Sequence, residues 1–281
     1  MSARLGGALA PLLMVWVLSK LGATPFAFGV LAAIGLAWAG WFVSWFRDRP
    51  DEMRGVTRAE IERIERGRAP IPKGHRRGRI SWRRLLGSPN VWALCLMYIC
   101  LGFGPNFYMT MFPDYLRKLR GFDDQTASWI ASAPLAFGVV GCVVGGWQSD
   151  RIIRATGNKM LGRRLVGALG LGLAAIPLTA TLFVSDPIAL AILHGLTFFG
   201  NDLAISPAWA ACADIGEEHA GVLSGLMNAS GGVVAAGWMF VVGRLLHNKM
   251  ETTLFVALAA AYVLGSLMWL RIDASKKLEV E

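Results

Sequence analysis

Long apolar runs alternate with short polar segments along most of this 281-residue chain. A helix needs about 20 mainly apolar residues to cross a hydrocarbon core about 30 Å thick. The pattern therefore predicts an all-α integral membrane protein, a helical bundle with eight transmembrane helices. The eight apolar runs are 5–22, 25–46, 90–112, 126–148, 163–184, 188–212, 221–245 and 252–270.

The composition agrees with the membrane class. Hydrophobic residues make up 54% of the chain and charged residues 17%, against roughly 25% charged residues in soluble domains. The first run is too long for a signal peptide, and a second run follows within a few residues. The cysteines, which all lie inside apolar runs without metal-ligand spacing, are interpreted as small packing residues. They are Cys95, Cys100, Cys142 and Cys212.

Positive charge is distributed unevenly between the two predicted sides of the membrane. With eight spans both termini fall on one side, which then carries 22 of the 28 Lys and Arg residues and leaves 6 for the other. The positive-inside rule places both termini in the cytoplasm of a multi-pass protein of the plasma (inner) membrane. The net charge of +9 is spread over membrane-flanking loops, which favours an orientation signal over nucleic-acid binding.

The longest polar segment divides the chain. Within it, "TRAEIERIERG" has Thr57 and Glu60 spaced as a capping box, which predicts a short amphipathic helix. The four expected parts are two transmembrane helices at 1–46, a basic cytoplasmic linker at 47–88, a six-helix bundle at 89–271 and a cytoplasmic tail at 272–281.

One short connection combines glycine, aspartate and arginine. The stretch "GGWQSDRIIRATGNKMLGRR" at 145–164 contains G-x-x-S-D-R, followed by G-R-R. This resembles the signature loop of the major facilitator superfamily (MFS), and the resemblance implies a conformational latch between helices. Asp150 is expected to accept hydrogen bonds from a neighbouring helix N-terminus, and the arginines to pair with acids or lipid phosphates. The alternative is a plain positive-inside loop. The latch residues would be Gly146, Asp150, Arg151, Arg163 and Arg164.

A second set of motifs narrows the resemblance. "FGNDLAISPAWAACADIGEEHAGVLSGLMNASGG" at 199–232, "FPDYLRKLRGF" at 112–122, and "FRDRPDE" with "AEIERI" after the second run are similar to the anion:cation symporter branch. Members carry small organic anions, usually with protons. The chain looks like the last eight spans of an MFS-like bundle of six plus six, the last two of the N-half and a complete C-half. Departures are the "GATPF" turn at 22–26 and the absence of spans one to four, where the family's main proton-carrying acids and an anion-pairing arginine lie.

Polar residues inside transmembrane spans are costly and often mark a pathway. In "GFGPNFYMT" the glycines and Pro105 weaken the helix, so Asn106 and Tyr108 are candidates to face a substrate cavity. The alternative is a Pro kink that Asn106 repairs. Asp202, near the middle of its run, is a candidate proton carrier, but a structural aspartate bonded to a neighbouring helix is favoured.

The resemblance also implies substrate-binding roles for Ser206, Trp209 and Asn228. Ser206 and Trp209 are one turn apart and are expected to share a helix face. The glycines around Asn228, at 221, 225, 231 and 232, and those at 138, 141 and 145 have close helix packing as their simpler explanation.

The sequence therefore predicts a secondary active transporter of small organic anions, such as sugar acids or aromatic or dicarboxylic acids, coupled to protons and working by alternating access as a truncated chain. The alternative is a non-transporting membrane remnant or partner subunit that packs against another membrane chain. A lipid-acting membrane enzyme is disfavoured, because no catalytic motif, metal cluster or cofactor motif is present. The expected partners are a small organic anion, protons, membrane lipids, and either the missing N-terminal spans or another membrane chain, with no nucleic acid.

Overall fold

The protein is seen here in a computed structural model whose regular elements, in the residues it describes, are all helices. The described residues are 24–47, 50–53, 55–66 and 81–278, with Gly6, Leu13 and Val17 in addition. The chain divides into two compact units, one formed by Leu9–Arg77 and the other by Met1–Ala8 with Gly78–Glu281. The boundary near residue 78 lies inside the linker that the sequence predicts at 47–88.

In the described part of the unit Leu9–Arg77 there is one long helix, α2 (Thr24–Trp45), which matches the predicted second span. Arg47, two residues after the end of this helix, donates from its guanidinium to the carbonyl oxygens of Val43 and Phe46 at 3.2 and 2.7 Å. The last carbonyls of a helix lack partners within the helix, so such a bond stabilises its C-terminus. The predicted first span, 5–22, falls almost wholly outside the described residues.

The same unit also contains the short linker helix that the sequence predicts. The helix α3 (Arg58–Arg66) follows a 3-10 turn, η1 (Pro50–Glu52). Its first turn closes on the carbonyl oxygen of Thr57, which accepts the backbone N–H groups of Glu60 and Ile61 at 3.0 Å. The helix α3 thus begins one residue after Thr57, and a capping box between the side chains of Thr57 and Glu60 stays a prediction.

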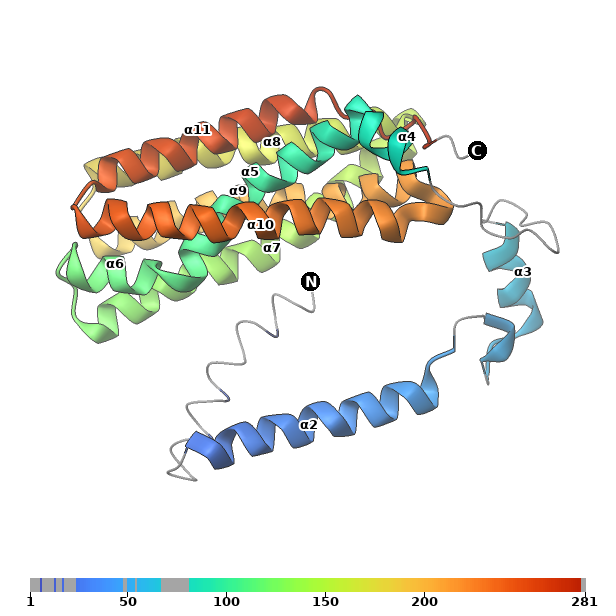
Figure 1. The fold of residues 1–281 in the computed structure, drawn as a ribbon, viewed down its shortest axis with the longest axis horizontal. Helices are drawn as coiled ribbons and strands as arrows, with labels where there is room; N and C mark the ends of the chain where they lie inside the picture. The colour runs from blue at the N-terminus through green and yellow to red at the C-terminus, as the bar shows by residue number, and fades with distance from the viewer. Residues whose placement is uncertain are drawn as a thin grey trace. The chain divides into compact units, whose positions relative to one another are not determined.

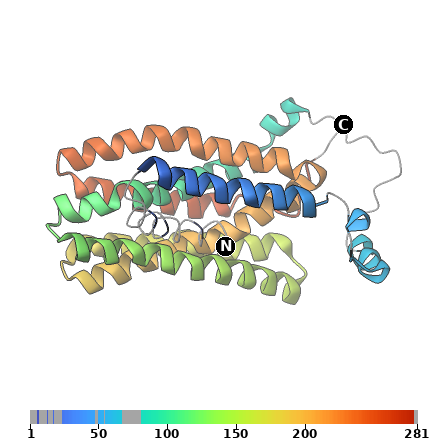
Figure 2. The same ribbon diagram turned by 90° about the horizontal axis from the view of Figure 1, so that it is seen from below.

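The unit Gly78–Glu281 is a bundle of long helices that run alongside one another (Figures 1 and 2). In it α9 packs against α7 and α8, α5 packs against α10 and α11, and α11 also contacts α8. The long helices are α5 (Pro89–Thr110), α7 (Asp124–Thr156), α8 (Lys159–Ala180), α9 (Pro187–Gly216), α10 (Ala220–His247) and α11 (Glu251–Trp269). Shorter elements are α4 (Trp82–Gly87), α6 (Phe112–Lys118), η2 (Thr181–Phe183) and η3 (Glu217–His219).

The lengths and apolar composition of these helices make this a multi-pass membrane protein. Among the described residues, six stretches are long and apolar enough to cross a membrane. One of them, Pro187–His247, has 61 residues and includes both α9 and α10. These six stretches thus hold seven long helices, α2 among them, and an eighth transmembrane helix at 5–22 stays a prediction.

Glycines on α7 allow α9 to approach closely. A Cβ atom at Gly141 would lie 2.4 Å from the carbonyl oxygen of Phe199, and one at Gly145 would lie 2.1 Å from that of Leu203. Real Cβ atoms do not come so near a backbone, so these positions require glycine at this helix separation. The predicted packing role of the α7 glycines is confirmed.

The glycines of α10 behave differently. A Cβ atom at Gly221, Gly225 or Gly232 would meet no atom of the structure within 4 Å. Only Gly231 faces a neighbour, because a Cβ atom there would lie 3.1 Å from the ring of Tyr98. No described helix of the unit Gly78–Glu281 therefore packs closely on the other three, and close helix packing there stays a prediction. They lie on a face of α10 that the other described helices of its own unit leave open.

The connection between α7 and α8 is much shorter than the sequence pattern indicates. The helix α7 continues to Thr156, so most of the stretch 145–164 is helical. Gly157 ends α7 in the left-handed conformation (φ 66°), and the side chain of Asn158 caps α8 by accepting the N–H of Leu161. A glycine C-cap followed directly by an asparagine N-cap makes a tight turn without further loop residues.

Candidate functional site

Three side chains from three helices meet on one face of the six-helix bundle. The ring of Trp209, on α9, lies edge-on to that of Tyr98, on α5, with centroids 6.0 Å apart and an interplanar angle of 85°. The hydroxyl of Tyr98 donates to the amide oxygen of Asn228, on α10, at 3.5 Å. Gly231, one turn after Asn228, leaves room for the Tyr98 ring. We call Tyr98, Trp209 and Asn228 the polar face.

The polar face is open. Trp209 is 43% exposed and Asn228 is also exposed, while Tyr98 is half-buried between them. An asparagine amide, an indole N–H and a tyrosine hydroxyl are all hydrogen-bond donors, and an aromatic wall suits the apolar part of an organic acid. The three side chains carry no charge, so the polar face can bind a carboxylate by hydrogen bonds but cannot neutralise it.

Ser206, which the sequence places on the same face as Trp209, is engaged elsewhere. Its hydroxyl donates to the carbonyl oxygen of Cys142, on α7, at 2.8 Å. Gly146 of α7 lies beside it, since a Cβ atom there would be 3.5 Å from the Cβ atom of Ser206. Ser206 therefore helps to join α9 to α7, next to the polar face and not within it.

The two candidates on α5 form hydrogen bonds outside the polar face. The side-chain amide of Asn106 donates to the carbonyl oxygen of Gly102, one turn back, at 2.8 Å. This bond ties the side chain to its own helix beside Pro105. Repair of a Pro kink by Asn106 stays a prediction, because the carbonyl that Pro105 leaves without an N–H partner is that of Leu101. The hydroxyl of Tyr108 lies 2.9 Å from Nδ1 of His194 in a fully buried contact with α9. A substrate role for either residue stays a prediction.

Asp202, on α9, is buried where α9 packs against α7. Its side chain is fully inaccessible and accepts a hydrogen bond from the side-chain amide of Asn201 at 3.0 Å. The other carboxyl oxygen lies against Gly138, where a Cβ atom would come within 2.8 Å. The bond to Asn201 lies within α9 itself, so a structural bond to a neighbouring helix and a proton-carrying role both stay predictions.

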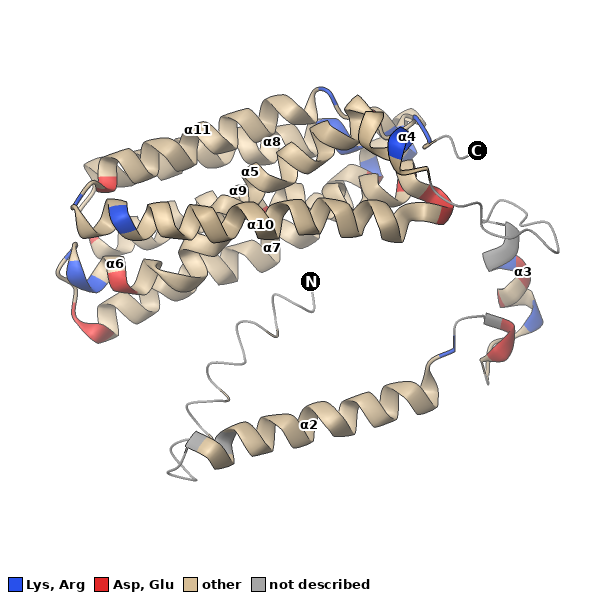
Figure 3. Ribbon diagram, in the orientation of Figure 1, with Lys and Arg blue, Asp and Glu red and all other residues tan. Residues whose placement is uncertain are grey.

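A charged network joins α7, α8 and α9 at one end of the bundle (Figure 3). Arg163 of α8 donates to Asp150 at 2.8 Å and to Ser149 at 2.9 Å, both on α7. Its Nε atom also lies 3.1 Å from the carboxylate of Asp214, on α9, which accepts a second bond from Lys159 at 2.8 Å. We call these five residues the Arg163 network.

The Arg163 network corrects the expected partner of Asp150. The sequence interpretation had Asp150 at a helix end, bonded to the N-terminus of a neighbouring helix. Asp150 instead lies inside α7, six residues before the end of that helix at Thr156, and bonds the side chain of Arg163. The N-terminus of α8 is capped by Asn158, so its backbone does not need Asp150.

The other basic residues of the predicted latch lie outside the Arg163 network. The guanidinium of Arg151 lies over the ring of Trp147, 5.2 Å from its centroid. Arg164 donates to the carbonyl oxygen of Ile272 at 3.1 Å and so ties α8 to the segment after α11. Of the five predicted latch residues, the structure joins Asp150 and Arg163 directly.

Sequence reasoning missed Tyr98 and the specific partner Asp214. Tyr98 lies in an apolar run, where the same rule that selected Asn106 could have found it, because a hydroxyl inside a span is costly. Asp214 belongs to the acidic segment "DIGEEH" at 214–219, and nothing local to it indicates a bond with Arg163. In the described residues, no group of three or more His, Cys, Asp or Glu is placed to hold a metal ion.

Comparison with known proteins bears on the family. The model of the Major Facilitator Superfamily matches residues 1–239. The chain is 32% identical over 280 residues to the probable sulfoacetate transporter SauU of Cupriavidus necator, covering 96% of this chain and 62% of that protein. It is 24% identical to a D-galactonate transporter of Escherichia coli, covering 94% and 63%, and 24% identical to the hexuronate transporter of Escherichia coli K12, covering 98% and 64%.

These relatives agree with the resemblance to the anion symporters and with the prediction that the chain is not an enzyme, since all three are named as transporters of organic acids. The chain spans less than two thirds of the length of each of them. The family model matches most of the chain, and one relative is 32% identical to it over 96% of its length. The chain belongs to the Major Facilitator Superfamily.

Proposed function

We propose that this chain takes part in secondary active transport of small organic anions across the inner membrane, and that the polar face is one wall of its substrate site. The observation that carries the proposal is the meeting of Tyr98, Trp209 and Asn228 from three helices on one open face. The named relatives are a probable sulfoacetate transporter, a galactonate transporter and a hexuronate transporter, and these three anions all have a carboxylate on a small polar body.

Asn228 contributes the most specific contact in this proposal. Its amide oxygen is held by Tyr98, which leaves the amide N–H groups free to donate to a carboxylate. Trp209 forms the wall beside it, and the edge-on contact with Tyr98 fixes the ring in place. The three residues therefore orient an acid group without contributing charge.

The opposite wall and the paired positive charge come from other membrane helices in this proposal. The open glycine face of α10, with Gly221, Gly225 and Gly232, lies on the same helix as Asn228 and is shaped for close approach of another helix. In this proposal protons drive the transport, and both termini of the chain are cytoplasmic. Alternating access arises when the polar face moves against the opposite wall of the site.

The test is uptake of radiolabelled galactonate, a hexuronate and sulfoacetate into proteoliposomes under an imposed proton gradient. We expect the 281-residue chain to accumulate none of them, because an anion held by one wall stays half in water, where polar contacts contribute little net free energy. A form with four further N-terminal membrane helices, in cis or co-expressed, should accumulate at least one.

In the extended form, Asn228→Ala should raise the KM by about 10- to 150-fold, since one charge-assisted hydrogen bond is worth about 1.5–3 kcal/mol. Asn248→Ala is the matched control, because Asn248 is also exposed but lies at the far end of α10. Absence of uptake by the extended form, with correct insertion, would favour the alternative of a partner subunit. Accumulation by the 281-residue chain alone would contradict the two-wall account.

A further inference from the structure

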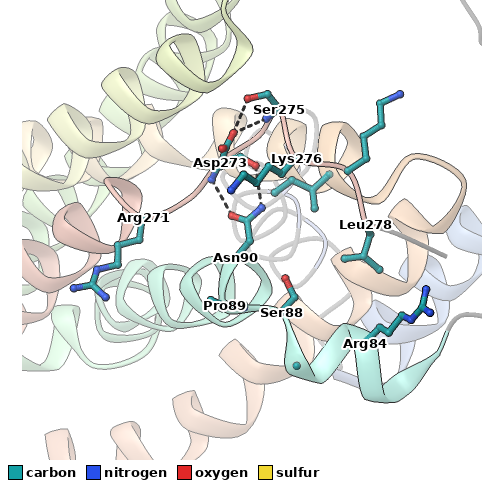
Figure 4. A pocket seen from close by; sticks show the side chains of 12 residues that line it. Arg84, Ser88, Pro89, Asn90, Arg271, Asp273, Ser275, Lys276 and Leu278 are labelled. Carbon is teal, nitrogen blue, oxygen red and sulfur yellow. Dashed lines mark hydrogen bonds between the residues drawn. The ribbon is translucent and has the colours of Figure 1, made fainter. Parts of the chain in front are cut away.

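A broad cavity lies at the end of the bundle where α5 begins and α11 has ended (Figure 4). Its volume is about 1160 Å³, slightly more than the roughly 300–1,000 Å³ of small-molecule pockets. Its walls come from the end of α4, the start of α5, Ile215 near the end of α9, and the segment 271–278. Two hydrogen bonds between Asn90 and the backbone of Asp273, at 2.9 and 2.8 Å, fix the segment against α5.

The lining of this cavity is basic. Arg84, Arg271, Lys276 and Lys277 line it, with Asp273 as the one acidic side chain in the lining. The ammonium group of Lys277 forms an ion pair with the carboxylate of Glu217, outside the lining, at 2.6 Å. The other three cations form no ion pair with any residue in the described range 81–278.

The one acid in the lining is already occupied. The carboxylate of Asp273 accepts the backbone N–H and the hydroxyl of Ser275, at 3.0 and 2.6 Å. These bonds hold the pKa of Asp273 below its ordinary value of 3.8. They also keep the carboxylate bonded to Ser275, two residues further along the chain. The nearby N-terminus of α5, where the side chain of Ser88 makes no capping bond, adds further positive potential.

Exposed aromatic residues place the cavity at the depth of the lipid headgroups. Trp82 and Leu86 on α4 are 58% and 44% exposed, and Trp92 in the first turn of α5 is 54% exposed. The indole of Trp92 donates to the carbonyl oxygen of Leu86, which fixes α4 to α5. Tryptophan is enriched where the hydrocarbon core meets the headgroups, and α4 also carries two arginines beside these apolar residues.

We propose that this cavity binds the phosphate-bearing headgroup of an anionic phospholipid, held by Arg84, Arg271 and Lys276. The headgroup supplies the negative charge that the lining lacks, and the acyl chains extend past Trp82 and Trp92 into the bilayer. A free phosphate offers the same charge, but it makes no use of the exposed apolar residues beside the cavity.

The test is native mass spectrometry of the purified 281-residue chain in a neutral detergent, titrated with dioctanoyl phosphatidylglycerol. Dioctanoyl phosphatidylcholine is the zwitterionic comparison, and inorganic phosphate and glycerol 3-phosphate are added as competitors. Each basic residue near a membrane surface contributes about 1 kcal/mol to binding an anionic lipid. The double variant Arg84→Gln/Lys276→Gln should therefore bind phosphatidylglycerol about 30-fold more weakly, and Lys276→Gln alone about fivefold more weakly.

The matched control is Arg244→Gln/Lys249→Gln, which removes two cations from the other end of the bundle (Figure 3). We expect this control to bind phosphatidylglycerol as the unmodified chain does, and phosphatidylcholine to bind weakly to every form. Equal loss in the control and the cavity variant would overturn the proposal, because the lipid would then bind non-specifically. Full displacement of the lipid by inorganic phosphate at equal concentration would overturn the assignment to a lipid.

Discussion

The two ion pairs of Arg163 should differ in strength, because their acidic partners differ in exposure to water. Arg163 and Asp214 are each 13% exposed and lie 3.1 Å apart, whereas Asp150, on the other side of the same guanidinium, is 60% exposed at 2.8 Å. Exposed ion pairs contribute about 0.2–1 kcal/mol to stability. Hydrogen bonds to charged groups shielded from water contribute about 1.5–3 kcal/mol. The contact of Arg163 with Asp214, although longer, should therefore stabilise the bundle more than the contact with Asp150.

Double-mutant cycles measure the two couplings separately. With Arg163→Gln, Asp214→Asn and Asp150→Asn, the coupling free energy of Arg163 with Asp214 should be about 1.5–3 kcal/mol, and that with Asp150 below about 1 kcal/mol. The cycle removes the contribution of Lys159, which also bonds Asp214. The free energy of unfolding is measured in mixed micelles by tryptophan fluorescence. The control is Arg154→Gln, an exposed arginine on α7, which should change the stability by less than about 0.5 kcal/mol.

One result would refute this reasoning. If the coupling with Asp150 equals or exceeds that with Asp214, then shielding from water does not decide the strength of the Arg163 network. The arrangement of α7, α8 and α9 at this end of the bundle would then have to differ from the one described.

Two further predictions concern packing and pH. Gly145→Ala should destabilise the bundle by about 1–3 kcal/mol, since its Cβ atom would lie 2.1 Å from a backbone oxygen. The matched change Gly225→Ala, on the open face of α10, should stabilise it by about 0.5–1 kcal/mol; equal effects on unfolding would contradict the packing. The folded pKa of Asp273 lies below 3.8, so its stabilising effect is complete above that value and is lost as the pH falls through the lower, folded pKa. Hydrogen exchange at the Ser275 amide, corrected for the intrinsic rate, should speed up over that acid range, and Asp273→Asn should abolish the transition; unchanged protection would contradict it.

The helical bundle and its family were largely predictable from the sequence, because membrane helices must satisfy their backbone internally and so leave long apolar runs. The runs at 90–112 and 252–270 match α5 and α11 within a few residues. Close packing of the α7 glycines was also predictable from their spacing. On α10 the same spacing stays a prediction, since a small-residue stripe does not say whether its partner lies in the same compact unit.

The candidate site was less predictable, because it depends on which side chains meet across distant segments. Tyr98 and Asn228 are 130 residues apart, and nothing local to Tyr98 indicates that contact. Asn106 and Tyr108 had the right chemistry, but side-chain direction was invisible in the sequence, and each is bonded away from the polar face. The predicted loop at 145–164 became helix because Gly157 and Asn158 can cap two helices in one turn.

The central claim is that the polar face lines a water-filled path and does not face lipid. Thiols react with maleimides as thiolates, which form only in contact with water. The four native cysteines are buried, so added ones can be followed in membrane vesicles that contain the chain. Asn228→Cys should react at least ~10-fold faster than Val263→Cys on α11, a position that is 47% exposed but lies among apolar residues. Equal, slow labelling at both positions would contradict the account, because Asn228 would then face lipid or another helix and could not bind a solute anion.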